Sequence, residues 1–108
     1  MVTVLKTRQE LKNHVKNYEV VIVKFKAEWC GPCKKVAPHI KTLMETYNKI
    51  NYVEVDVDDG SNIASYLKIR SIPTIISYVN GDIHEILSSS NTSDITTFFV
   101  KTNQYVAK

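Results

Sequence analysis

The sequence has few of the features that mark a specialised class of protein. It holds two cysteines, three glycines and three prolines among its 108 residues. Two cysteines only three positions apart close too small a loop to stabilise a fold, so a disulfide scaffold is excluded. No stretch approaches the roughly 20 apolar residues that a membrane-spanning helix needs. The start of the chain also lacks the apolar run typical of a signal peptide.

Charge of either sign is modest as well. The net charge is +3 and the lysines are scattered along the chain, which does not favour nucleic-acid binding. A content of 44% hydrophobic and 23% charged residues is that of an ordinary globular protein. We therefore expect a single domain over residues 1–108, a monomer without nucleic acid or a membrane as partner. The cysteine pair favours a reducing compartment, and we expect a cytoplasmic protein.

The most informative stretch is Trp29-Cys30-Gly31-Pro32-Cys33, which contains both cysteines and the only tryptophan. An apolar run at 20–25 precedes it, and apolar residues at helical spacing follow from Val36. Cys30 is thus expected at or next to a helix N-terminus, with Cys33 one turn inside. Unpaired backbone N–H groups at that position stabilise a thiolate. A thiolate attacks disulfides, and a second nearby cysteine can resolve the mixed disulfide that forms.

The rest of the chain alternates between patterns typical of strands and of helices. Asn80-Gly81 is a strong signal for a two-residue hairpin, which would make the last two strands antiparallel. The other strands alternate with helices, which predicts an α/β protein with a mainly parallel sheet covered on both faces. We expect strands at 2–5, 20–26, 52–57, 75–79 and 83–87, and helices after Thr7, over about 33–48, after Gly60, and from 91–94 onward.

In these motifs the chain resembles the thioredoxin family over nearly its whole length. The resemblance rests on Ala27-Glu28-Trp29-Cys30-Gly31-Pro32-Cys33-Lys34, Ala37-Pro38, Val55-Asp56-Val57-Asp58, Ile72-Pro73-Thr74 and Asn80-Gly81, in this order. It implies the thioredoxin fold, a central five-stranded mixed sheet of order 1-3-2-4-5 flanked by four helices. It also implies a cis peptide bond between Ile72 and Pro73, facing the cysteines.

The resemblance further implies a protein-disulfide reductase that takes part in electron transport and cell redox homeostasis. Cys30 would be the exposed attacking nucleophile and Cys33 the buried resolving thiol. The implied partners are disulfide-containing protein substrates and a flavin-dependent thioredoxin reductase, and no cofactor is implied for the chain itself. The backbone before Pro73 would pair with the partner chain in a β-like contact. The implied substrate-binding residues are Trp29, Gly31, Pro32, Ile72 and Pro73.

The sequence departs from the family pattern at two charged positions. The family usually has a buried aspartate six residues before the first cysteine, where this chain has Lys24, and a lysine where it has Glu54. We expect Lys24 and Glu54 to be neighbours with exchanged charges. The exchange is either structurally neutral or a retuning of thiol pKa values and proton transfer at Cys33. Two further departures are Lys26, where the family often has an aromatic residue, and Ser88-Ser89-Ser90, in place of a Gly-Ala pair.

The sequence is also compared with three other functions: a disulfide isomerase or oxidant, a binding subunit, and a zinc site. A disulfide isomerase or oxidant would usually have a signal peptide and a histidine between the cysteines, and we find neither feature in this sequence. A thioredoxin-fold binding subunit would use the fold to stabilise a partner, with incidental cysteines. A zinc site needs four ligands, and His14, His39 and His84 are on elements that should not converge on the cysteines, so we expect no metal.

Overall fold

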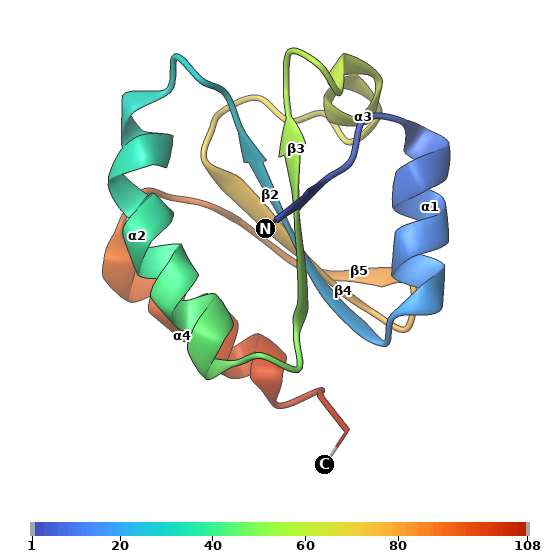
Figure 1. Cartoon of the computed structure of the whole chain (residues 1–108), viewed down its shortest axis with the longest axis vertical. Helices are drawn as coiled ribbons and strands as arrows, with labels where there is room; N and C mark the ends of the chain where they lie inside the picture. Colours follow the sequence, from blue (N-terminus) through green and yellow to red (C-terminus); the bar gives the residue numbers. More distant parts are fainter. Residues whose placement is uncertain (1, 108) are drawn as a thin grey trace.

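Five strands form one sheet in the computed structural model, which describes residues 2–107. The strand order is β1-β3-β2-β4-β5, and four helices flank the sheet (Figure 1). This confirms the expected α/β class and the order 1-3-2-4-5. The elements are β1 (Thr3–Val4), α1 (Arg8–Asn17), β2 (Val20–Lys26), α2 (Gly31–Thr46), β3 (Asn51–Asp56), α3 (Ser61–Tyr66), β4 (Thr74–Val79), β5 (Asp82–Ser88) and α4 (Thr92–Asn103).

The central strand is β2, which pairs in parallel with β3 and antiparallel with β4. The strand β1 adds to β3 in parallel, and β5 adds to β4 through the predicted hairpin. Asn80 and Gly81 have φ values of 52° and 87°. Positive φ at both residues of a two-residue loop is what a twisted antiparallel hairpin requires, and glycine reaches it without a steric penalty.

Alternate side chains of β2 point to opposite faces of the sheet, and each face has its own apolar core. Val21, Val23 and Phe25 pack under α1 and α3. Val20 and Ile22 pack under α2 and α4, which lie together on the other face (Figure 1). Lys24 belongs to the second set by register, so a lysine is placed where the pattern predicts an apolar residue. The strand is buried on both faces, as its nearly continuous apolar sequence predicts.

Side-chain caps begin three of the helices, α1, α2 and α4. Thr7, after which the sequence predicts a helix, forms a capping box with Glu10 at the start of α1, and Asn91 caps α4 by accepting from the backbone of Ser93 and Asp94. Cys30 is the N-cap of α2, which therefore begins two residues before the expected position. No helix within residues 2–107 combines the length and apolarity needed to cross a membrane.

The three histidines lie apart from one another. His14 is half-buried and hydrogen-bonded to Asn51, and His84 is exposed. His39 is half-buried, with its Nε2 2.7 Å from Thr96 Oγ1. The reason is the close approach of α2 to α4, which the spacing within one helix does not reveal.

Candidate active site

The two cysteines meet at the start of α2, where they are joined by a disulfide bond. Cys30 is the N-cap, and the backbone N–H of Cys33 donates to Cys30 Sγ over 3.2 Å. The sulfur therefore lies against the positive end of the helix dipole, where negative charge is stabilised. Both cysteines are only 3% exposed. The expected contrast between an exposed Cys30 and a buried Cys33 is thus wrong for this oxidised form, because loop residues cover both.

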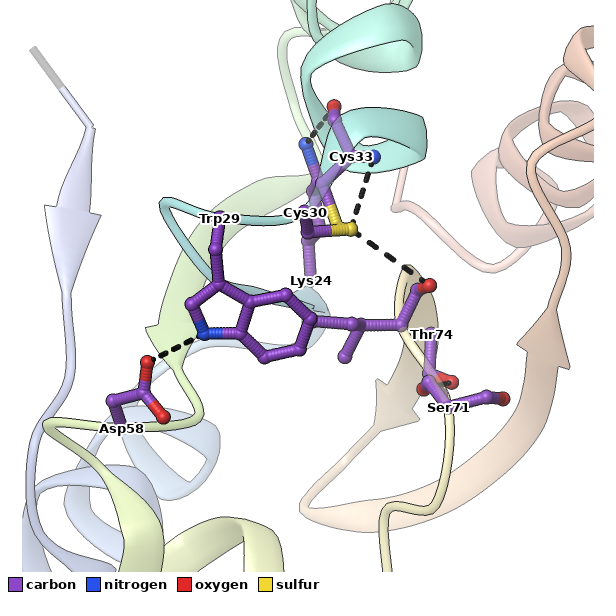
Figure 2. Close-up of a disulfide and its surroundings, with 8 residues drawn as sticks. Lys24, Trp29, Cys30, Cys33, Asp58, Ser71 and Thr74 are labelled. Atoms are coloured by element: carbon purple, nitrogen blue, oxygen red, sulfur yellow. Dashed lines mark hydrogen bonds between the residues drawn. A yellow bond between two sulfur atoms is a disulfide. The ribbon is translucent and has the colours of Figure 1, made fainter.

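The covering loop contains the Ile72–Pro73 peptide bond, which is cis as expected. Cys30 Sγ lies 3.8 Å from the carbonyl oxygen of Ile72 (Figure 2). Ile72 and Val57 also pack against the small apolar cluster of Ala27 and the two cysteines. The loop and the cysteine turn, far apart in the sequence, are therefore in direct contact.

A hydroxyl at the end of the loop fastens it to the sheet. Thr74 Oγ1 donates to the carbonyl oxygen of Ser71 over 2.6 Å and is 2.7 Å from Ser88 Oγ. Ser88 is the first residue of the serine run noted as a departure from the family pattern. Its hydroxyl links β5 to the start of β4 beside the site, a contact that sequence reasoning missed because it depends on strand register.

The expected substrate-binding residues differ in exposure. Trp29 is 69% exposed, Gly31 and Pro32 are exposed, Ile72 is half-buried and Pro73 is buried. The indole Nε1 of Trp29 donates to Asp58 Oδ2 over 2.9 Å (Figure 2). Asp58 is thus part of the site, although the sequence singled it out only as the end of a strand motif. Its bond holds the large exposed ring in one orientation beside the cysteines.

Lys24 lies directly beneath the first turn of α2. It is 2% exposed, and its Nζ donates to the carbonyl oxygen of Cys33 over 3.4 Å (Figure 2). Burial lowers the pKa of the Lys24 ammonium group, and the negative charge of Glu54 opposes that change in part. The site therefore contains a buried amine within one hydrogen bond of the second cysteine.

The register places Glu54 opposite Lys24, as expected, but the carboxylate is bound elsewhere. Its ion pair is with Lys26, at 3.4 Å, and the hydroxyl of Tyr52 donates to it over 2.7 Å. Burial, and then the neighbouring carboxylate, raise the pKa of Tyr52 well above its ordinary value, so this hydroxyl stays a donor. Lys26, noted only as the loss of an aromatic residue, thus forms the ion pair with Glu54 that was expected for Lys24.

Residues 2–107 contain no cluster of three or more histidine, cysteine or acidic side chains that could hold a metal ion. The functional groups of the site are the two sulfurs, the backbone of the helix start and of the Ile72 loop, the exposed indole and the buried amine. Two adjacent sulfurs that interconvert between a disulfide and a dithiol can exchange electrons with another disulfide.

Comparison with known proteins agrees with this chemistry. The family model described as Thioredoxin matches residues 2–101. Thioredoxin 1 of Plasmodium falciparum is 39% identical over 93 residues, which cover 86% of this chain and 89% of that protein. Thioredoxin-1 of Saccharomyces cerevisiae is 36% identical over 81 residues, covering 75% and 79%. A solved structure of Plasmodium falciparum thioredoxin has a TM-score of 0.88 at 36% identity and covers 93% of this chain and 98% of its own. The chain therefore belongs to the thioredoxin family and is a thiol–disulfide oxidoreductase that reduces protein disulfides.

Proposed function

We propose that this chain reduces protein disulfides with Cys30 as the attacking thiolate and Cys33 as the resolving thiol. The observation that carries the assignment is the position of Cys30 as N-cap of α2, with the Cys33 N–H aimed at its sulfur. In the reduced protein this N–H and the helix dipole stabilise a thiolate on Cys30. Cys33 is one turn inside the helix, beneath the sulfur that would carry the mixed disulfide.

Reduction of a substrate disulfide takes two thiol–disulfide exchange steps. The Cys30 thiolate attacks one sulfur of the substrate disulfide, and the other substrate sulfur leaves as a thiolate and takes a proton from solvent. The Cys33 thiolate then attacks Cys30 Sγ, which releases the second substrate thiolate and forms the Cys30–Cys33 disulfide. The substrate gains two electrons and the protein loses two. The structure contains the Cys30–Cys33 disulfide, so it shows the protein in the oxidised form that the second step produces.

Substrate proteins would dock on the surface formed by Trp29, Gly31, Pro32, Ile72 and Pro73. The exposed indole supplies apolar area, and the backbone at Ile72 offers a carbonyl group beside Cys30 for a β-like contact with an extended substrate segment. Such main-chain pairing needs little sequence specificity, which suits a reductase of many proteins. We also propose that the chain acts as a monomer in the cytoplasm and is re-reduced there by a thioredoxin reductase.

The test is the reduction of insulin disulfides with dithiothreitol as electron source. The wild type should accelerate the reaction, while Cys30→Ser and Cys33→Ser should fall to the rate of dithiothreitol alone. When first reduced and then freed of dithiothreitol, the Cys33→Ser variant should also retain insulin as a mixed disulfide on a non-reducing gel, and Cys30→Ser should not. The double variant is the matched control for nonspecific trapping. Stable trapping by Cys30→Ser instead would reverse the assigned roles, and an inactive wild type would refute the proposal.

A further inference from the structure

Lys24 is the only charged residue that is buried among residues 2–107. It lies at 2% exposure on β2, between Val23 and Phe25, and faces the side of the sheet covered by α2. Its Nζ donates to the carbonyl oxygen of Cys33, so the amine is aimed at the helix turn that carries the resolving thiol (Figure 2). Covalent geometry then limits the separation between Nζ and Cys33 Sγ to about 8 Å at most.

The buried amine has no counter-ion in contact with it. Lys24 forms no ion pair in the described part of the chain, and Glu54, opposite it on β3, is bound by Lys26 and Tyr52. On the other side, β4 places the uncharged Ile75 opposite Lys24. Burial consequently disfavours the ammonium form and lowers the pKa of Lys24, with Glu54 opposing and Lys26 adding to this effect.

The remaining charged groups near this face point elsewhere. The carboxylate of Asp56 on β3 accepts from the backbone of Asp58 and Asp59, and Asp94 and Lys101 on α4 are exposed. On α2, the side chain of His39 is bound to Thr96, and the other charged side chains are exposed: Lys34, Lys35, Lys41 and Glu45. The titratable groups that the start of α2 offers to Lys24 are therefore the two cysteines. In the disulfide state neither carries charge. In the reduced state an anion on Cys33 would supply the nearby partner that the amine lacks.

We propose that the ammonium group of Lys24 stabilises the thiolate of Cys33 and so promotes the step that resolves the mixed disulfide. This rests on the roles of the two cysteines proposed above. Lys24 acts as a positioning residue, because it affects the reacting sulfur through its charge without touching substrate. The Cys33 thiol loses its proton to solvent, and its thiolate attacks Cys30 Sγ. The bond between Cys30 and the substrate sulfur breaks as the Cys30–Cys33 bond forms, and the substrate thiolate leaves with the electron pair.

The charge should be visible in the pKa of Cys33 itself. In a Cys30→Ser background, Cys33 is the single thiol, and its ionisation can be followed by the ultraviolet absorbance of the thiolate or by NMR of labelled cysteine. An opposite charge within about 4–6 Å lowers a pKa by about 1–3, and the bound of about 8 Å between Nζ and Sγ includes this range. Adding Lys24→Met should therefore raise the measured pKa of Cys33 by about one or more. Circular dichroism establishes that each variant is folded.

Lys26→Met is the matched control. It removes a positive charge two positions along the same strand and face, from a side chain that is already paired with Glu54. It should shift the pKa of Cys33 much less than Lys24→Met does. Equal shifts in the two variants, or no shift in folded Lys24→Met, would overturn the proposal.

A second measurement does not depend on folding of Lys24→Met. Because coupling between two sites is reciprocal, NMR titration of the labelled Lys24 side chain should give a higher pKa in the reduced wild type than in the oxidised form. Equal values in both redox states would refute the coupling. These readouts need no turnover, so they separate this proposal from the catalytic one. Loss of insulin reduction with the Cys33 shift intact would refute only the catalytic roles.

Discussion

Replacement of Lys24 by methionine should stabilise the oxidised protein. The side chain is 2% exposed, forms no ion pair among residues 2–107, and makes one hydrogen bond, to the Cys33 carbonyl oxygen. Methionine has a similar length and an apolar, flexible side chain that fits an irregular core. The substitution does not strand a negative charge either, because Glu54 keeps Lys26 and Tyr52 as partners.

The size of the effect follows from two opposing contributions. Replacement of buried ionic groups by apolar residues of similar volume changes stability from nothing to a gain of about 1–4 kcal/mol. The lost hydrogen bond, at 3.4 Å between Nζ and the Cys33 oxygen, removes at most about 0.5–1.5 kcal/mol. We therefore expect the free energy of unfolding at pH 7 to rise by up to about 3 kcal/mol, which is the upper gain less the lost hydrogen bond.

The gain should depend on pH in a defined direction. The pKa of folded Lys24 lies below its ordinary value of 10.5, because burial disfavours the charged form. Between the lowered folded pKa and the unfolded one, the unfolded chain binds more protons, so wild-type stability rises with pH relative to the variant. The advantage of Lys24→Met is thus fully present below the lowered pKa and shrinks as the pH rises toward the ordinary value of 10.5.

The assay is urea denaturation of both oxidised proteins at pH 7 and pH 10, followed by circular dichroism. Lys26→Met serves as the control, because it removes a partly exposed lysine in an ion pair and should lower stability by at most about 1 kcal/mol. A Lys24→Met protein that is less stable than the wild type at pH 7 would refute the reasoning. So would a stability difference that grows between pH 7 and pH 10.

Two further predictions concern residues around the site. Gly60→Ala should lower the free energy of unfolding by about 1–3 kcal/mol in a urea titration, because a Cβ there would lie 2.8 Å from Val55 Cγ1. An unchanged urea midpoint would contradict this prediction and show that Val55 moves aside at little cost. Asp58→Ala should lower kcat/KM for insulin reduction about two- to fivefold by freeing the indole of Trp29, which loses a hydrogen bond of 2.9 Å. The fluorescence of this single tryptophan should change as well, and unaltered fluorescence and kcat/KM would show that the bond does not hold the ring.

The stability prediction and the inferred role of Lys24 belong together. A buried amine that lacks a paired anion is a cost to the fold, and proteins tolerate such costs mainly at functional sites. If Lys24→Met both stabilises the oxidised form and raises the pKa of Cys33, the lysine is maintained for its charge. If the pKa does not move, the lysine is a structural exchange with no effect on the resolving thiol.

The sequence alone determined the elements, their order and the position of the cysteines. Local signals were sufficient for this: the apolar run of β2, the capping box at Thr7, the Asn80-Gly81 hairpin, and helical spacing after the cysteine turn. These features depend on backbone propensity and periodicity within a few residues, which a sequence states directly. The strand order and the cis bond before Pro73 came from family resemblance, because neither follows from local signals.

Only the tertiary structure decided which side chains meet. The strand register places Lys24 opposite Glu54, yet the Glu54 carboxylate is paired with Lys26. The register fixes which residues are neighbours, whereas side-chain conformation and packing decide which of them form contacts. Two hydrogen bonds likewise join segments that are distant in sequence, His39 to Thr96 and Trp29 to Asp58. The burial of Cys30 also depends on contacts with a distant loop. Periodicity assigns a residue to a face, whereas partners on that face depend on how separate elements pack. The hydrogen bond from the Lys24 amine to the Cys33 carbonyl oxygen therefore depends on how β2 packs against α2.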